Sequence, residues 1–146
     1  MEAAPKVLRG KGMPVRILIA DDDVSLRYLL RRILEERPGW EVCGEAANGN
    51  DAVAKIKQLA PDLAIIDLAM PDKNGMEAAR QIFAISPLTG MLLLTVQEVS
   101  EELAGAAREA GFRGAVTKGS GREVVMAVET LLDKGTLFDV EEFPHA

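Results

Sequence analysis

The sequence is poor in the residues on which several kinds of enzyme chemistry depend. Its 146 residues include one cysteine, Cys43, and one histidine, His145, in the penultimate position. A single cysteine cannot form an internal disulfide or a multi-cysteine metal site, and we expect Cys43 to be an unreactive strand residue. A histidine at the end of the chain leaves no base for a Ser/His/Asp or Cys/His arrangement inside a fold, which excludes that class of enzymes.

Long hydrophobic runs and an excess of basic residues are also missing. The longest apolar runs, at 17–20 and 91–94, are far shorter than the ~20 residues of a membrane helix, and no hydrophobic signal core stands at the N-terminus. We therefore expect a soluble, cytoplasmic protein that does not associate with membranes. Seventeen basic against 23 acidic residues give a net charge of −6, which argues against direct nucleic-acid binding.

The length suits one domain that buries roughly two thirds of its unfolded surface. Residues 1–14 have no periodicity and predict a flexible N-terminal arm, 15–135 predict the folded domain, and 136–146 predict an acidic tail or the start of a linker. Within 15–135, short apolar runs alternate five times with helical patterns. This alternation predicts an α/β fold, a doubly wound five-stranded parallel sheet of order 2-1-3-4-5, flavodoxin-like. The expected strands are 15–20, 41–46, 63–66, 91–95 and 114–117, and the expected helices follow each of them, ending near 37, 60, 85, 110 and 135.

Polar residues stand where these strands end, and the strand order would bring them together. Asp21 and Asp22 follow the first strand, Asp67 ends the third, and Thr95 and Lys118 stand at the ends of the fourth and fifth. Close carboxylates repel each other by about 4 kcal/mol per pair at an effective dielectric near 20, so the cluster requires a cation. Oxygen ligands favour Mg²⁺. A metal, an ammonium and a hydroxyl around one further carboxylate suit transfer of a phosphoryl group.

These residues resemble the receiver domain of bacterial two-component response regulators, of the kind often joined to a helix-turn-helix DNA-binding domain. The resemblance covers about 15–135. The matched features are the acidic pair 21–22, Asp67 followed by Met70-Pro71 and Gly75, then Thr95 and Lys118, each in order at a strand end.

The resemblance implies a phosphoacceptor switch rather than an enzyme. Asp67 would accept a phosphoryl group from a sensor histidine kinase or a small phosphodonor. Asp22 and Asp67 would bind Mg²⁺ directly together with the backbone carbonyl of Ala69, and Asp21 would act through water. Lys118 would bind the phosphoryl oxygens.

The resemblance also implies how the switch is read. Thr95 would turn its hydroxyl toward the phosphoryl group, and the face made by helix 100–110, strand 114–117 and the last helix would meet partners, a second copy of the chain among them. Ala69 and Gln97, two residues beyond Asp67 and Thr95, would tune the lifetime of the acyl phosphate. Of the two, Gln97 can position a water and Ala69 cannot.

Three positions depart from the family pattern. Ala115 replaces the usual Tyr or Phe three residues before the lysine, Val96 replaces a small residue and could narrow the entrance to Asp67, and Gly119 replaces a frequent proline, which puts a cis peptide in doubt. These departures keep open a receiver-like interaction module with weak or no phosphorylation dependence. An aspartyl-nucleophile phosphatase is disfavoured, because Ala69 stands where that chemistry needs a second acid.

The last residues of the sequence bear on whether a second domain follows the receiver. The segment 134–138 looks like the end of receivers joined to a helix-turn-helix domain, but 136–146 is too short to form one. We therefore expect either a lone receiver or part of a longer protein. Phe138 and Phe143 are interpreted as packing or tail residues rather than as a docking motif.

Overall fold

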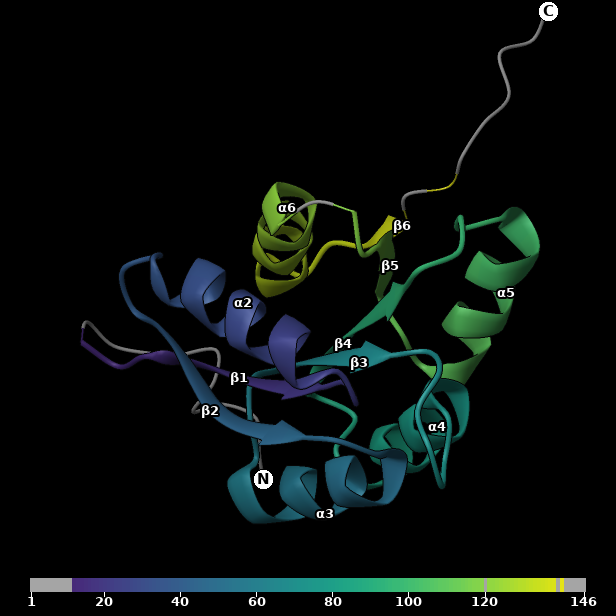
Figure 1. The fold of residues 1–146 in the computed structure, drawn as a ribbon, viewed down its shortest axis with the longest axis horizontal. Helices are drawn as coiled ribbons and strands as arrows, with labels where there is room; N and C mark the ends of the chain where they lie inside the picture. The colour runs from purple at the N-terminus through teal and green to yellow at the C-terminus, as the bar shows by residue number, and fades with distance from the viewer. Residues whose placement is uncertain (1–11, 120, 139, 141–146) are drawn as a thin grey trace, which may run out of the picture.

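The computed structural model describes residues 12–119, 121–138 and 140, so most of the expected arm, Phe143 and His145 lie outside the described residues. Strands and helices alternate along the chain (Figure 1). They are β1 (Val15–Ala20), α2 (Val24–Glu35), β2 (Trp40–Ala46), α3 (Gly49–Leu59), β3 (Leu63–Asp67), α4 (Gly75–Ile85), β4 (Gly90–Thr95), α5 (Glu101–Ala110), β5 (Gly114–Thr117), α6 (Gly121–Leu132) and β6 (Leu137–Phe138).

The strands form one parallel sheet in the order β2-β1-β3-β4-β5-β6. The doubly wound fold and the order 2-1-3-4-5 are therefore confirmed. The sequence did not predict β6, which lies in the segment interpreted as a tail or linker. Its two residues pair with Gly114 and Ala115 of β5, so the sheet is one short strand wider than expected.

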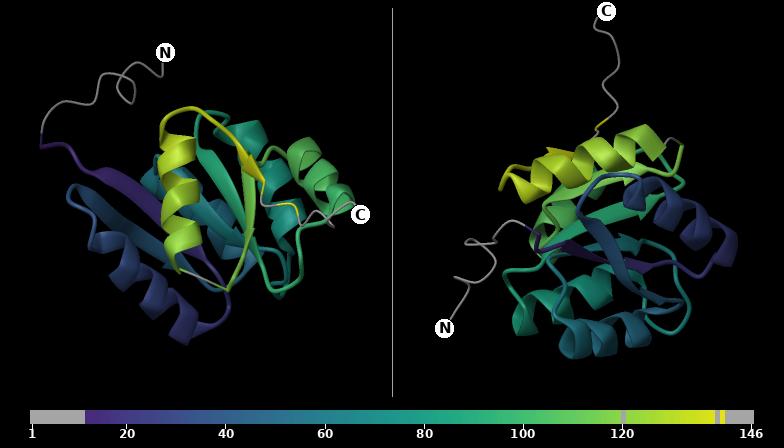
Figure 2. Two further views of the ribbon diagram at one scale, coloured as in Figure 1. Left: turned by 90° about the horizontal axis from the view of Figure 1, so that it is seen from above. Right: turned by 90° about the vertical axis from the view of Figure 1, so that its left-hand side faces the viewer.

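Helices cover both faces of the sheet (Figure 2). Helices α2 and α6 pack on one face, and α3, α4 and α5 pack on the other. The central strands carry the core: Ile19, Ile65 and Leu92 point to the first face, Leu18 and Ile66 to the second, and all five are fully buried. Burying each such side chain contributes about 1.5–3 kcal/mol. The apolar runs of the sequence are strands because both of their faces are covered.

Four helices begin at a polar side chain that accepts a hydrogen bond from the first turn. Asp23 caps α2, Asn48 caps α3, Asn74 caps α4 together with Glu77 in a capping box, and Ser100 caps α5. Each cap satisfies backbone donors that the helix itself cannot. Only a few residues separate the end of each of the strands β1 to β4 from the cap of the next helix. The loops that connect them therefore lie at the same edge of the sheet.

Within the described part of the chain, no helix combines the length and the apolar character needed to span a bilayer.

Candidate functional site

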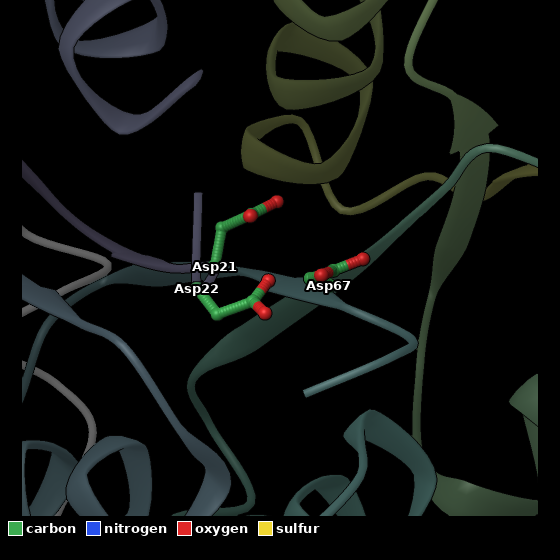
Figure 3. A group of neighbouring side chains, drawn as sticks. All are labelled: Asp21, Asp22 and Asp67. Carbon is green, nitrogen blue, oxygen red and sulfur yellow. The ribbon is translucent and has the colours of Figure 1, made fainter. Parts of the chain in front are cut away.

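Three acidic side chains meet at the carboxyl edge of the sheet. Asp21 directly follows β1 and Asp67 ends β3, and these strands are neighbours, with Ala20 paired to Ile66. Figure 3 shows Asp21, Asp22 and Asp67 projecting from the adjacent strand ends. One carboxylate oxygen from each lies within 4.8 Å of the others. Asp21 is 0% exposed and Asp67 is 3% exposed, whereas Asp22 is open to solvent.

Lys118 brings one positive charge to the buried acids. Its backbone N–H donates to the Thr95 carbonyl oxygen at 2.8 Å, which fixes the residue at the end of β5. The ammonium nitrogen lies 2.9 Å from Asp21 Oδ2 and 3.1 Å from Asp67 Oδ1. Lys118 is therefore in direct contact with Asp21 and Asp67, two of the three acids that the sequence predicted to share a crevice.

The pKa values of Asp67 and Lys118 are both shifted, because one ammonium is shared between two buried carboxyl groups. Burial raises the pKa of the Asp67 carboxyl above its ordinary value, and the Asp21 carboxylate raises it further, although Lys118 opposes both effects. Burial alone would lower the pKa of Lys118, but the two aspartates outweigh it and the lysine pKa is raised. The site therefore stabilises the charged form of Lys118 and destabilises the charged form of Asp67, relative to the same groups in water.

The cluster fits a divalent cation. Three carboxylates against one ammonium leave a formal charge of −2. Asp21 Oδ2 is fully buried, and the Lys118 ammonium lies 2.9 Å from it. Oxygen ligands in a partly open site are those of hard ions such as Mg²⁺. The arrangement is therefore of the kind that holds such an ion.

A pocket opens over Asp67, and the next strand end supplies its far wall. The Thr95 side chain is 2% exposed, and its hydroxyl oxygen accepts a hydrogen bond from the Gln97 N–H at 3.2 Å. Val96 is 82% exposed, so it stands at the rim with most of its surface in solvent. The pocket is lined by Asp22, Asp23, Asp67, Leu68, Ala69, Thr95, Val96, Gln97 and Lys118.

The loop after β3 is closely packed against Asp67. The Gly75 N–H donates to the Leu68 carbonyl oxygen at 2.8 Å, and a Cβ on Gly75 would lie only 2.3 Å from the Asp67 carbonyl oxygen. Glycine is required because no side chain fits this approach. The proline and glycine that follow Asp67 in the sequence therefore turn the chain back over the strand end.

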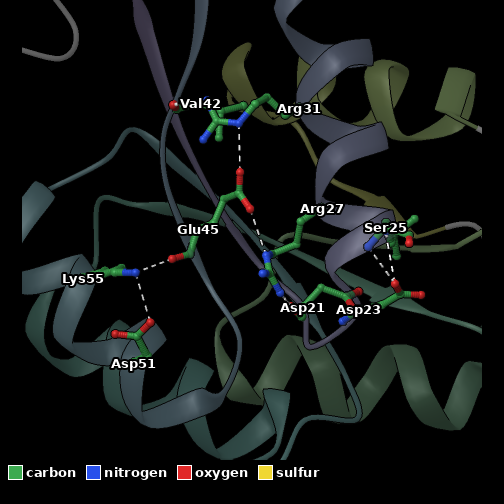
Figure 4. Close-up of polar contacts among 10 residues, drawn as sticks. Asp21, Asp23, Ser25, Arg27, Arg31, Val42, Glu45, Asp51 and Lys55 are labelled. Atoms are coloured by element: carbon green, nitrogen blue, oxygen red, sulfur yellow. Dashed lines mark hydrogen bonds and ion pairs between the residues drawn. The ribbon is translucent and has the colours of Figure 1, made fainter.

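A basic and acidic network that sequence reasoning missed supports the Asp21 backbone (Figure 4). Arg27 donates to the Asp21 carbonyl oxygen at 2.6 Å and to Glu45 at 2.9 Å, and Arg31 donates to Glu45 at 2.8 Å. The Asp23 N–H also donates to Asp21 Oδ1 at 2.8 Å. No sequence pattern marks Arg27, because its partners come from other elements.

Two of the departures from the family pattern can be placed. Ala115 is fully buried on the face that α5 covers, and it pairs with Phe138 of the neighbouring strand β6. Among the described residues the peptide bonds are trans, which agrees with the doubt about a cis peptide before Gly119.

Comparisons with known proteins agree with this geometry. The family model described as response regulator receiver domain matches residues 17–129. The chemotaxis protein CheY of Thermotoga maritima is 44% identical over 75 residues, which cover 51% of this chain and 62% of CheY. The response regulator UvrY of Escherichia coli is 35% identical over 118 residues, which cover 80% of this chain and 54% of UvrY. The matched part thus spans less than two thirds of either relative.

Among solved structures, a LuxR-family two-component response regulator from Aurantimonas sp. SI85-9A1 is similar, with a TM-score of 0.82 and 34% identity. The match covers 86% of this chain and 90% of that one.

Proposed function

The chain belongs to the response regulator receiver domain family, and on this premise we propose that Asp67 accepts a phosphoryl group from a sensor histidine kinase or a small phosphodonor. The domain is a phosphoacceptor switch rather than an enzyme, and its acidic pocket with Lys118 is typical of such a site. The observation that carries the assignment to Asp67 is its position: it is the buried carboxylate that also lines the pocket, in contact with the ammonium.

The chemistry follows from this placement. An Asp67 carboxylate oxygen attacks the phosphorus atom, and the bond from phosphorus to the donor nitrogen or oxygen breaks with its electron pair staying on the donor. Lys118, held as an ammonium, neutralises charge on the phosphoryl oxygens. Thr95 receives a hydrogen bond from Gln97, so its own hydroxyl hydrogen remains available to donate to a phosphoryl oxygen. Asp67 is the nucleophile, Lys118 the electrostatic partner and Thr95 the switch residue.

We propose that Asp22, Asp67 and the Ala69 carbonyl hold Mg²⁺, with Asp21 acting through water. Two buried acids that share one ammonium, and the formal charge of −2 on the whole cluster, support this assignment. When bound, the ion would offset negative charge on the transferring group. Gln97 and Ala69, both on the pocket wall, are proposed to set the lifetime of the acyl phosphate, because only the Gln97 amide can position a water.

The face made by α5, β5 and α6 is proposed to meet partners, including a second copy of the chain. A partner on this face would also contact β6, because β6 lies along β5. Ala115 supports a second candidate, an interaction module whose contacts do not depend on phosphorylation, since the usual aromatic side chain is missing.

Labelling by acetyl phosphate tests the assignment. We expect Mg²⁺-dependent addition of one phosphoryl group, seen as a mass increase of the intact chain, that disappears in Asp67→Asn. Asp23→Asn is the matched control, because it removes an acid from the same pocket while asparagine keeps the helix cap. Labelling that persists in Asp67→Asn would refute the role of Asp67. Intact labelling with unchanged partner binding would favour the interaction module.

A further inference from the structure

The last strand closes an edge that would otherwise be open. Leu137 and Phe138 pair with Gly114 and Ala115, and the Leu137 N–H donates to the Arg113 carbonyl oxygen at 3.1 Å. Without β6, β5 would expose a row of unpaired backbone groups at the edge of the sheet. The segment is therefore part of the fold, although it is only two residues long.

Phe138 occupies the room that a small neighbour leaves. In a parallel sheet, paired residues point to the same face, so Phe138 lies beside the fully buried Ala115 on the side covered by α5. Arg108 of α5 places its guanidinium 4.2 Å from the centre of the Phe138 ring. The ring is thus held by β5 on one side and by α5 on the other.

One short loop joins the phosphoacceptor pocket to this segment. Thr95 and Val96 line the pocket. A few residues further on, Val99 is 0% exposed and forms a parallel bridge with Val140. Ser100 then caps α5, the helix that carries Arg108. The same loop therefore lines the pocket at one end and pairs with the C-terminal segment at the other.

We propose that β6 and Val140 form a latch whose docking is coupled to occupancy of the pocket, with Phe138 as its anchor. The inference rests on the proposed function and adds to it the element that transmits the state of Asp67. A group bound in the pocket fixes Thr95 and orders the loop up to Val99. The latch then docks on a loop that is already ordered and loses less conformational entropy, so each event favours the other. By reciprocity, loss of the latch weakens binding in the pocket by a similar factor.

Amide hydrogen exchange measured by NMR on the whole chain tests the coupling, with Mg²⁺ and beryllium fluoride as the probe of the pocket. Binding is followed through the amide signals of Thr95 and Lys118. We expect exchange of the Leu137 amide to slow about fivefold or more when the pocket is saturated. In Phe138→Ala the affinity for the probe should fall by a comparable factor, and Phe138→Tyr, which keeps the ring, should retain it.

Tyr28→Ala is the matched control, because Tyr28 is a 62% exposed ring on α2, a helix on the opposite face of the sheet, and it has its own arginine contact, with the Arg32 guanidinium 5.9 Å from the ring centre. It should leave affinity and Leu137 exchange unchanged, and circular dichroism checks that each variant is folded. If the probe binds and Leu137 exchange stays within twofold, the latch is refuted while the proposed function stands. Failure of the probe to bind the wild-type chain would overturn both.

Discussion

At the scale of residues, burial decides what each charge in the pocket does. Two opposite charges 4 Å apart attract by about 4 kcal/mol at an effective dielectric of 20. Lys118 has this kind of contact with both Asp21 and Asp67, but it can neutralise only one of them. The pKa of Asp67 is raised, mainly by burial and then by Asp21, even though an ammonium touches it. The remaining negative charge is what makes the pocket receptive to a cation.

Glu45 shows the opposite balance and gives a prediction on pH. Burial alone would raise its pKa, but hydrogen bonds and charge from Arg31 and Arg27 outweigh burial, and the pKa is lowered from its ordinary value of 4.5. A lowered folded-state pKa means that the stabilisation is fully present above about pH 4.5 and is lost as the pH falls through the folded-state pKa. We expect Glu45→Gln to lower the free energy of unfolding by about 1 kcal/mol at pH 7, and this difference should shrink below pH 4.5.

Urea unfolding at a series of pH values measures this difference. Glu41→Gln is the control, because Glu41 is an exposed acid on the same strand, and it should change stability little at any pH. A Glu45→Gln effect that is the same at pH 3 and pH 7 would contradict the ionic origin.

At the scale of elements, close approach between the turn after β3 and the start of α4 shapes the site. Gly75 is the first residue of α4 and lies against the Asp67 carbonyl oxygen, while the Leu68 N–H donates to the Leu94 carbonyl oxygen at 2.9 Å. The Asn74–Glu77 capping box fixes where α4 begins. The backbone that presents Asp67 is thus held on both sides.

Paired glycine substitutions test this contact. The Cβ of Gly75→Ala would lie 2.3 Å from the Asp67 carbonyl oxygen, so the backbone must move. We expect the free energy of unfolding to fall by about 1–3 kcal/mol and acetyl phosphate labelling to slow. Gly105→Ala is the matched control within α5, where nothing lies within 4 Å of the added carbon. It should raise stability by about 0.5–1 kcal/mol and leave labelling unchanged; equal effects of the two substitutions would argue against the contact.

At the scale of the whole molecule, the sheet order brings distant acids together, and this links folding to metal binding. Asp21, Asp22 and Asp67 are within reach of one ion only when β1 and β3 are neighbours. The unfolded chain has no such site. An ion that binds only the folded state stabilises it by mass action.

We therefore expect Mg²⁺ to raise the melting temperature of the whole chain. At about ten times its Kd the gain is about 1.4 kcal/mol, or roughly 3–6 °C. Scanning calorimetry with and without a chelator measures the shift, which Asp22→Asn should abolish. Asp72→Asn is the control, since Asp72 is an exposed acid outside the pocket lining, and asparagine tolerates its positive φ of 70°. A shift that survives in Asp22→Asn would contradict the proposed ligand set.

The sequence by itself determined the doubly wound fold, the order of strands β1 to β5 and the strand ends at which the acids and the lysine stand. A short continuous apolar run such as 63–66, bounded by Pro61 and Pro71, indicates a buried parallel strand. The run is too short for a helix, and its side chains are apolar on both faces of the strand. Strand–helix alternation restricts the sheet to very few orders. This order places Asp67 and Lys118 at one edge of the sheet.

Only the tertiary structure decided how these residues touch and what else reaches them. The Arg27 contact with the Asp21 backbone, the Val99 bridge to Val140 and the pairing of Ala115 with Phe138 each join separate elements. Local periodicity carries no information about such pairs, because two residues of strand are too few for a pattern and a charged side chain can select among many partners. Their positions follow from the packing of the whole sheet, which sets the distance between groups that lie far apart along the chain.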